Sequence, residues 1–201
     1  MIAIIDYDAG NLRSVAKALD ALGLENTVTK DRDTILAADR VILPGVGAFG
    51  DAMSHIRDLG LDKVIYEAVD MNKPFLGICL GLQLLFESSD ESPGATGLGI
   101  LKGRIVRIPD TPGLKVPHIG WNSLHLQNDG RLFKGLPDES YVYFVHSYYL
   151  QAEDESIVKA TTEYGAHIHA SVEQGNVFAC QFLPVKSSSV GAKILTNFAG
   201  V

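Results

Sequence analysis

Short apolar runs bounded by turn residues recur along the first half of the chain. Residues 2–5, 41–43 and 75–78 are continuous apolar stretches, a pattern typical of strands buried on both faces of a parallel sheet. Apolar residues at helical spacing follow these runs and predict helices over residues 12–22, 49–57, 61–71 and from Gly81 to about Glu87. Strand and helix therefore alternate, as in a doubly wound α/β sheet.

The second half has a different pattern, in which strands predominate. Runs rich in β-branched and aromatic residues predict strands at residues 103–108, 141–145, 157–162, 168–173 and 177–182. Gln174-Gly175 predicts a hairpin turn between the last two strands, and a helix over residues 189–198 follows. We therefore predict an α/β fold with a doubly wound, mainly parallel sheet and an antiparallel extension in the second half. Because we find no internal repeat, low-complexity tract or linker, we expect residues 1–201 to form a single domain.

The composition suits a compact globular protein and excludes several functions. Of the 201 residues, 46% are hydrophobic and 20% are charged, which allows a sizeable core. The net charge of −7, with no run of five basic residues, argues against nucleic-acid binding. Met1 is followed directly by a strand-like run rather than a signal peptide, and no apolar run approaches the roughly 18 residues that a membrane span needs.

The cysteine content favours a reducing compartment. The chain has two cysteines, Cys79 and Cys180, which fit a cytoplasmic location better than a disulfide framework. Cys180 lies within an apolar strand, so we expect it to be an inert core residue.

Cys79 has the sequence context of a nucleophile elbow. It follows the apolar run 75–78, and Gly77 and Gly81 stand two residues to either side. A strand that turns straight into a helix crowds its own backbone, and residues without a Cβ relieve that crowding. The helix N-terminus beside the sulfur would favour a thiolate. The alternative is a buried structural cysteine that happens to be flanked by glycines.

A second loop falls at the same edge of the predicted sheet. Pro44-Gly45-Val46-Gly47 follows the run 41–43, and its two glycines allow backbone N–H groups to point toward one place. In open α/β sheets, ligands bind beyond the carboxyl ends of the strands. Both this loop and Cys79 therefore belong to the predicted ligand site.

Several motifs together resemble a known family. Gly77-Ile-Cys-Leu-Gly-Leu-Gln83 resembles the nucleophile motif of the class I (triad) glutamine amidotransferases, and Pro44-Gly-Val-Gly47 resembles their oxyanion loop. Val116-Pro-His-Ile-Gly-Trp-Asn122 and Tyr143-Phe-Val-His-Ser-Tyr148 resemble, more narrowly, the amidotransferase subunits of imidazole glycerol phosphate synthase in histidine biosynthesis. Thr161-Thr-Glu-Tyr-Gly165 continues the same order. The resemblance covers essentially the whole chain.

The resemblance implies a set of roles for glutamine hydrolysis. The Cys79 thiolate would attack the side-chain amide carbon of glutamine. The backbone N–H groups implied to stabilise the oxyanion are those of Leu80 and of Gly45, Val46 and Gly47. The residues implied to hold glutamine are Gln83, His146, Ser147 and Tyr148. Ammonia would then pass to a partner subunit, a (β/α)8-barrel cyclase.

The resemblance also implies an interface with that cyclase. The residues it places there are Asn11, His118, Trp121 and Lys186, although Lys186 reads equally well as an ordinary solvated lysine. No cofactor is implied. The histidines are scattered and no Cys/His spacing suits zinc, so we expect no metal site.

One departure from the family pattern bears directly on activity. After Gln181-Phe182 the family has His-Pro-Glu-Lys-Ser, whereas this chain has Leu-Pro-Val-Lys-Ser. Leu183 therefore occupies the position of the general base, and Val185 that of the residue that orients it. Neither side chain can take a proton, so we predict that glutamine hydrolysis is nearly abolished. His167 and His169 lie on a neighbouring strand, but we do not expect either to replace the base.

These observations leave several functions open. The first is an amidotransferase subunit of imidazole glycerol phosphate synthase with impaired hydrolysis, and the second is a non-catalytic docking or regulatory subunit of the cyclase. An amidotransferase subunit of another synthase and an unrelated cysteine hydrolase are further alternatives. Leu183 and Val185 fit either an inactivation that keeps the fold and the docking surface, or a natural member whose partner uses free ammonia.

Overall fold

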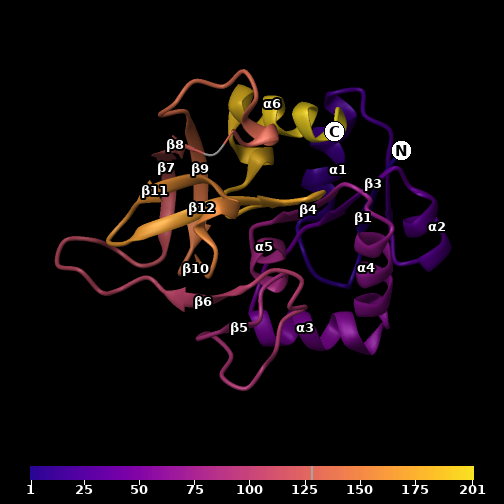
Figure 1. Ribbon diagram of the computed structural model, residues 1–201, viewed down its shortest axis with the longest axis horizontal. Helices are drawn as coiled ribbons and strands as arrows, with labels where there is room; N and C mark the ends of the chain where they lie inside the picture. Colours follow the sequence, from indigo (N-terminus) through magenta and orange to yellow (C-terminus); the bar gives the residue numbers. More distant parts are fainter. Residues whose placement is uncertain (128) are drawn as a thin grey trace.

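A computed structural model describes residues 1–127 and 129–201 (Figure 1). The strands in the described residues are β1 (Ile2–Ile5), β2 (Asn26–Thr29), β3 (Arg40–Leu43), β4 (Phe75–Ile78), β5 (Ser88–Ser89), β6 (Gly103–Arg107), β7 (His118–Ser123), β8 (His125–Leu126), β9 (Tyr141–His146), β10 (Tyr148–Ala152), β11 (Val158–Glu163), β12 (His167–Gln174) and β13 (Val177–Cys180). The α-helices are α1 (Leu12–Ala21), α2 (Arg32–Ala37), α3 (Phe49–Asp58), α4 (Leu61–Asp70), α5 (Leu80–Leu84) and α6 (Ser188–Ala199).

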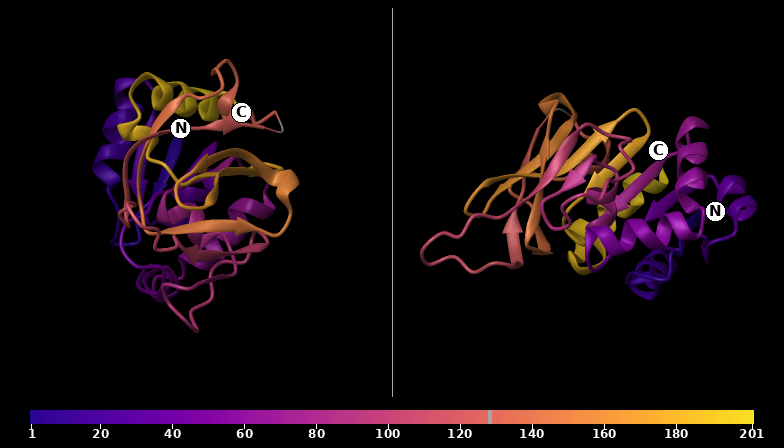
Figure 2. Two further views of the ribbon diagram at one scale, coloured as in Figure 1. Left: turned by 90° about the vertical axis from the view of Figure 1, so that its left-hand side faces the viewer. Right: turned by 90° about the horizontal axis from the view of Figure 1, so that it is seen from below.

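The main sheet has a parallel half and an antiparallel half. Its strand order is β2-β1-β3-β4-β13-β12-β10-β6-β5. The pairs from β2 to β13 are parallel, and the pairs from β13 to β6 are antiparallel. Figure 2 shows the antiparallel part extending away from the helical half. The predicted α/β fold with an antiparallel extension is confirmed.

Helices cover both faces of the parallel half. Side chains of β1 alternate between two core clusters: Ile2 and Ile4 pack with α1 and α6, while Ala3 and Ile5 pack with α2 to α5. Figure 1 shows α1 and α6 above the sheet and α3, α4 and α5 below it. Because both faces are buried, the central strands are apolar throughout. This burial explains why continuous apolar runs identified β1, β3 and β4.

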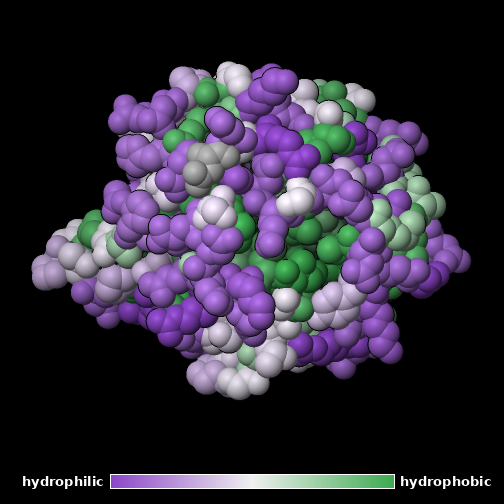
Figure 3. Space-filling model, in the orientation of Figure 1, coloured by the Kyte–Doolittle hydropathy of each residue, from purple (hydrophilic) through white to green (hydrophobic). Residues whose placement is uncertain are grey.

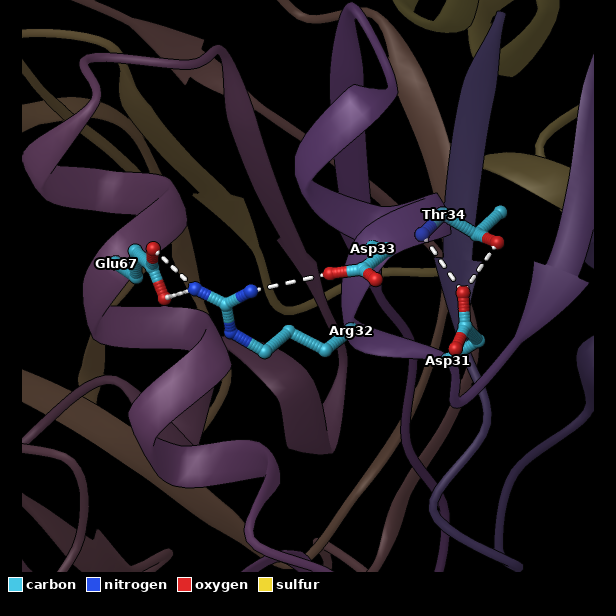
Figure 4. Close-up of polar contacts among 5 residues, drawn as sticks. All are labelled: Asp31, Arg32, Asp33, Thr34 and Glu67. Atoms are coloured by element: carbon cyan, nitrogen blue, oxygen red, sulfur yellow. Dashed lines mark hydrogen bonds and ion pairs between the residues drawn. The ribbon is translucent and has the colours of Figure 1, made fainter.

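Two elements between β1 and β3 were absent from the prediction. β2 is the edge strand, and its sequence Asn-Thr-Val-Thr is only partly buried, so it lacks an apolar run. The short helix α2 is capped by Asp31, whose carboxylate accepts from the Thr34 N–H at 2.9 Å. The Arg32 guanidinium joins α2 to α4 through both Glu67 oxygens at 2.6 and 2.7 Å (Figure 4). Because the pair is exposed, water and salt screen it and its contribution to stability is small.

The second half also contains strands that the prediction lacked. β7 and β10 were absent, and β7 pairs with β9 in a separate two-stranded sheet. The predicted hairpin is present, but Gln174 still pairs with Val177, so the turn is Gly175-Asn176 rather than Gln174-Gly175. Helix α5 begins at Leu80, before Gly81, and ends at Leu84.

The surface is largely hydrophilic on the face shown in Figure 3, with a hydrophobic group right of centre. Within residues 1–127 and 129–201, we find no helix with the length and apolar character needed to cross a membrane.

We predict that Gly81→Ala destabilises the fold by about 3 kcal/mol or more. A Cβ at residue 81 would lie 1.9 Å from the carbonyl oxygen of Leu43, so β3 and α5 would have to separate. Gly200→Ala is the matched control, because its Cβ would meet nothing closer than 3.5 Å. Urea unfolding would show the difference, and a Gly81→Ala protein as stable as the control would contradict the close approach.

Candidate active site

Cys79 lies at a strained turn between β4 and α5. Its backbone has φ 58° and ψ −113°, a conformation that L-residues rarely adopt and that costs about 1–3 kcal/mol. The neighbouring glycines allow the turn. A Cβ on Gly77 would lie 2.7 Å from the Gly81 oxygen, and one on Gly81 would strike β3. The geometry is that of a nucleophile elbow, as the spacing predicted.

The elbow opens into a cleft of about 340 Å³, within the range of small-molecule sites. The cleft brings together with Cys79 most of the residues predicted for catalysis and glutamine binding: Val46, Gly47, Leu80, Gln83, His146, Ser147, Tyr148 and Leu183. Gly45 is not among the residues that line the cleft. It packs on the elbow so closely that a Cβ at this position would lie 2.8 Å from Leu80 Cβ. The loop after β3 therefore packs directly on the elbow.

The environment of the sulfur disfavours the thiolate. Burial raises the pKa of Cys79 to about 11, although the Leu80 backbone N–H and the Gln181 side chain oppose this shift. Gln181 Nε2 lies 3.9 Å from Sγ. The expectation that the sulfur would be held as a thiolate is wrong in its net effect, because desolvation by burial outweighs the hydrogen bonds that favour the thiolate.

The two replaced positions lie in different surroundings. Leu183 is half-buried and lines the cleft beside Cys79. Val185 lies outside the cleft, in an apolar hollow between α1 and α6 that Leu22 and Leu195 also line. An apolar side chain therefore lines the cleft, together with the thiol, at the position where the family pattern has a proton acceptor.

His146 is the one histidine that lines the cleft among the described residues, and both its ring nitrogens are engaged. Nδ1 lies 2.9 Å from the Tyr148 carbonyl, which can only accept, so Nδ1 carries the proton. Nε2 then accepts from His118 Nδ1 at 3.0 Å, and the Asn122 amide lies 3.4 Å from His118 Nε2. This series of hydrogen bonds leaves no free lone pair on His146 that could deprotonate Cys79.

His167 and His169 line a separate hollow with Glu155, away from the residues of the cleft. His169 Nδ1 accepts from the Ala152 N–H at 3.1 Å, and His167 contacts the Glu163 carboxylate. Within the described residues, no three His, Cys, Asp or Glu side chains gather in a way that could hold a metal ion.

Three of the four residues predicted for the partner interface are exposed. Asn11 and Lys186 are exposed, and Trp121 has 52% of its surface accessible. Trp121 packs edge-on against Tyr143, whose ring lies 5.6 Å from Lys186 Nζ.

His118 does not fit the interface prediction. Only 2% of its surface is accessible, and it stacks between Phe144 and Tyr164 with ring centroids at 4.6 and 3.9 Å. Alternation along β7 explains the difference: His118 points inward, whereas Ile119 and Trp121 point outward.

Glu91 lines the cleft but was absent from the predicted site. Its carboxylate accepts from the Phe49 N–H at the start of α3, at 2.9 Å, and it is the one carboxylate among the lining residues that the structure describes. The surrounding Asp-Glu-Ser sequence resembles an ordinary polar loop, so the sequence carried no signal for it.

The comparisons with known proteins agree with this geometry. The family model for glutamine amidotransferase class-I matches residues 3–200. The chain belongs to this family. Solved structures titled as a glutamine amidotransferase and as PurLQS from Thermotoga maritima share the family's fold, each with a TM-score of 0.77 at 21% and 20% identity. They cover 100% and 99% of this chain, and 100% and 97% of their own.

Relatives with higher sequence identity show which of the class I amidotransferases this chain is similar to. The chain is 51% identical over 197 residues to imidazole glycerol phosphate synthase subunit HisH of Moorella thermoacetica, covering 98% of this chain and 93% of the relative. It is also 51% identical to the protein of that name from Aquifex aeolicus, covering 97% and 94%. The Bacillus cereus protein of that name is 50% identical, covering 100% and 95%.

We predict that acid weakens the fold through the His118–His146 pair. Burial lowers the pKa of each to about 4, from an ordinary value of 6.5. Between these values the unfolded chain binds protons that the folded chain does not, so stability falls as the pH drops from about 6.5 to 4, by at most roughly 7 kcal/mol and by less where solvent screens the rings.

Urea unfolding at pH 7.5 and 5.0 would measure this dependence. His118→Phe keeps the stacking and removes one titrating group, so its stability should change less between the two pH values. His55→Gln, at an exposed position on α3, should leave the wild-type dependence unchanged. An equal slope in His118→Phe and wild type would contradict the assignment.

Proposed function

We propose that residues 1–201 form a single amidotransferase domain that serves as the glutamine-binding subunit of an imidazole glycerol phosphate synthase in histidine biosynthesis, with its own hydrolysis strongly impaired. Full-length relatives of about 50% identity bear that subunit's name. The observation that carries the impairment is Leu183, which lines the cleft at Cys79. The two free cysteines fit a reducing cytoplasm.

The cleft offers complementary groups for glutamine. The Glu91 carboxylate suits the α-ammonium group, a charge-assisted contact. Gln83 also lines the cleft, and its Nε2 donates to the Tyr148 carbonyl at 3.1 Å and to Gln181 Oε1 at 3.0 Å. These contacts orient the corner at residues 146–148 that lines the same cleft. The side-chain amide of glutamine would then reach Cys79.

Acylation of Cys79 would proceed through a tetrahedral oxyanion. The N–H groups of Leu80 and of the 45–47 loop would stabilise it, a contribution commonly worth about 3–4 kcal/mol per donor. The thiol must first lose its proton, and its pKa of about 11 makes the thiolate scarce at neutral pH. The leaving amine must also gain a proton, and water must later be activated. The Leu183 side chain can carry out none of these proton transfers.

A partner cyclase with a (β/α)8-barrel would receive the ammonia. The exposed Trp121 and Lys186 form a cluster with the half-buried Tyr143, and this cluster suits such an interface. The second candidate function is a non-catalytic docking or regulatory subunit of the cyclase. Leu183 and Val185 favour it, because both pack with the core while removing the proton-transfer groups.

We predict that Leu183→His with Val185→Glu raises glutaminase turnover by about 10³-fold or more, because loss of a triad histidine costs on the order of 10⁶ in turnover. Ammonia release would be measured with the cyclase and its nucleotide substrate present. Leu183→His alone should gain less, and Cys79→Ala in the double variant should abolish the gain. Wild-type turnover within about 10² of the double variant would refute the proposed impairment.

We predict that Glu91→Gln weakens glutamine binding by about 10- to 100-fold, the loss of a hydrogen bond to a charged group. Calorimetric titration of the wild-type chain and the variant would measure it. The amide oxygen that Glu91→Gln introduces can still accept from the Phe49 N–H, so the hydrogen bond at the start of α3 is retained. Asp90→Asn, at an exposed neighbour outside the cleft, should bind glutamine as wild type does.

A further inference from the structure

Tyr7 is a fully buried phenol beneath the loop that packs on the elbow. It lies two residues after the end of β1, it is 0% exposed, and its hydroxyl donates to the Pro44 carbonyl at 3.0 Å. A Cβ on Gly45 would lie 2.6 Å from the Tyr7 oxygen and 2.8 Å from Leu80 Cβ. The phenol and the elbow therefore hold Gly45 between them.

This contact fixes the beginning of the loop. The Pro44 carbonyl belongs to a planar peptide with the Gly45 nitrogen, so a hydrogen bond to that carbonyl fixes the orientation of the whole peptide group. Val46 and Gly47 follow within two residues and line the cleft with Cys79. Burial raises the pKa of Tyr7 above its ordinary value, so the phenol remains protonated and continues to donate in neutral solution.

We propose that Tyr7 is a positioning residue for acyl transfer: its hydroxyl sets the 44–47 loop at the place where backbone N–H groups meet the developing oxyanion. This proposal rests on the proposed function of the loop. Tyr7 does not contact the substrate, since the cleft lining does not include it. It acts through the Pro44 peptide.

Two reagents separate oxyanion stabilisation from access to the sulfur. With the 4-nitrophenyl ester of the γ-carboxyl of glutamate, the Cys79 thiolate forms a C–S bond and the carbonyl oxygen becomes an oxyanion. The C–O ester bond then breaks, nitrophenolate leaves with the electron pair, and the thiol proton passes to the buffer. Iodoacetamide alkylates the same sulfur by displacing iodide, with no oxyanion. Nitrophenolate needs no proton, so Leu183 does not block the first reaction.

We expect Tyr7→Phe to slow acylation of Cys79 by about 10-fold or more, since loss of a direct oxyanion donor costs 10²–10³. Alkylation by iodoacetamide should change less than about twofold. Replacement of Tyr7 by 4-aminophenylalanine, which keeps an N–H donor, should recover most of the acylation rate. Equal slowing of both reactions, or no slowing of either, would overturn the proposal.

Hydrogen exchange gives a second readout on the same variant. Amides of residues 44–48 should exchange faster in Tyr7→Phe, while those of β1 should exchange as in wild type. Faster exchange in β1 as well would indicate general loosening and would overturn the positioning role. Failure of the proposed function gives a different result: the wild-type ratio of acylation to alkylation rates would equal that of N-acetylcysteine.

Discussion

The site depends on one close approach, between the start of α5 and the end of β3. Gly81 lies so near the Leu43 carbonyl that even a methyl group would collide with it. This contact places the helix directly over the strand end and forces Cys79 into a positive φ. It also brings the loop after β3 against Leu80. The positions of the sulfur, the loop and the cleft therefore follow from packing the start of α5 on the end of β3 with no side chain between them.

Burial determines what the sulfur can do in this arrangement. The elbow removes Cys79 from water, and the resulting desolvation raises the thiol pKa more than nearby N–H groups lower it. A buried thiol of this kind needs a base at hydrogen-bond distance. The buried Gln181 amide lies 3.9 Å from the sulfur, Leu183 adds an apolar group to the cleft lining, and His146 has both nitrogens in use. The inactivity we propose therefore follows from the loss of proton transfer, because the nucleophile itself is in place.

The sequence predicted those parts of the structure in which one residue type has one physical purpose. Buried parallel strands need continuous apolar runs, and the elbow needs glycine at two fixed positions, so β1, β4 and the site of Cys79 could be located. β2 was missed because an edge strand needs no apolar run. Glu91 and the buried state of His118 depend on which segments meet in space, and no local pattern records that.

Fold and activity respond differently to the residues at 183 and 185. In the folded chain both side chains pack against a core cluster, where leucine and valine lose nothing by being buried. A histidine and a glutamate at the same places would have to be desolvated and satisfied by each other. Leucine and valine therefore avoid the desolvation cost that a histidine and a glutamate would add to folding. Catalysis needs that pair of polar residues in spite of the cost. An intact elbow and a Trp121–Lys186 cluster can persist in a chain that no longer moves protons, because residue 183 is tied to Tyr143 and Lys186 through its backbone, whose N–H donates to the Tyr143 carbonyl at 2.9 Å and whose carbonyl accepts from the Lys186 N–H at 3.0 Å.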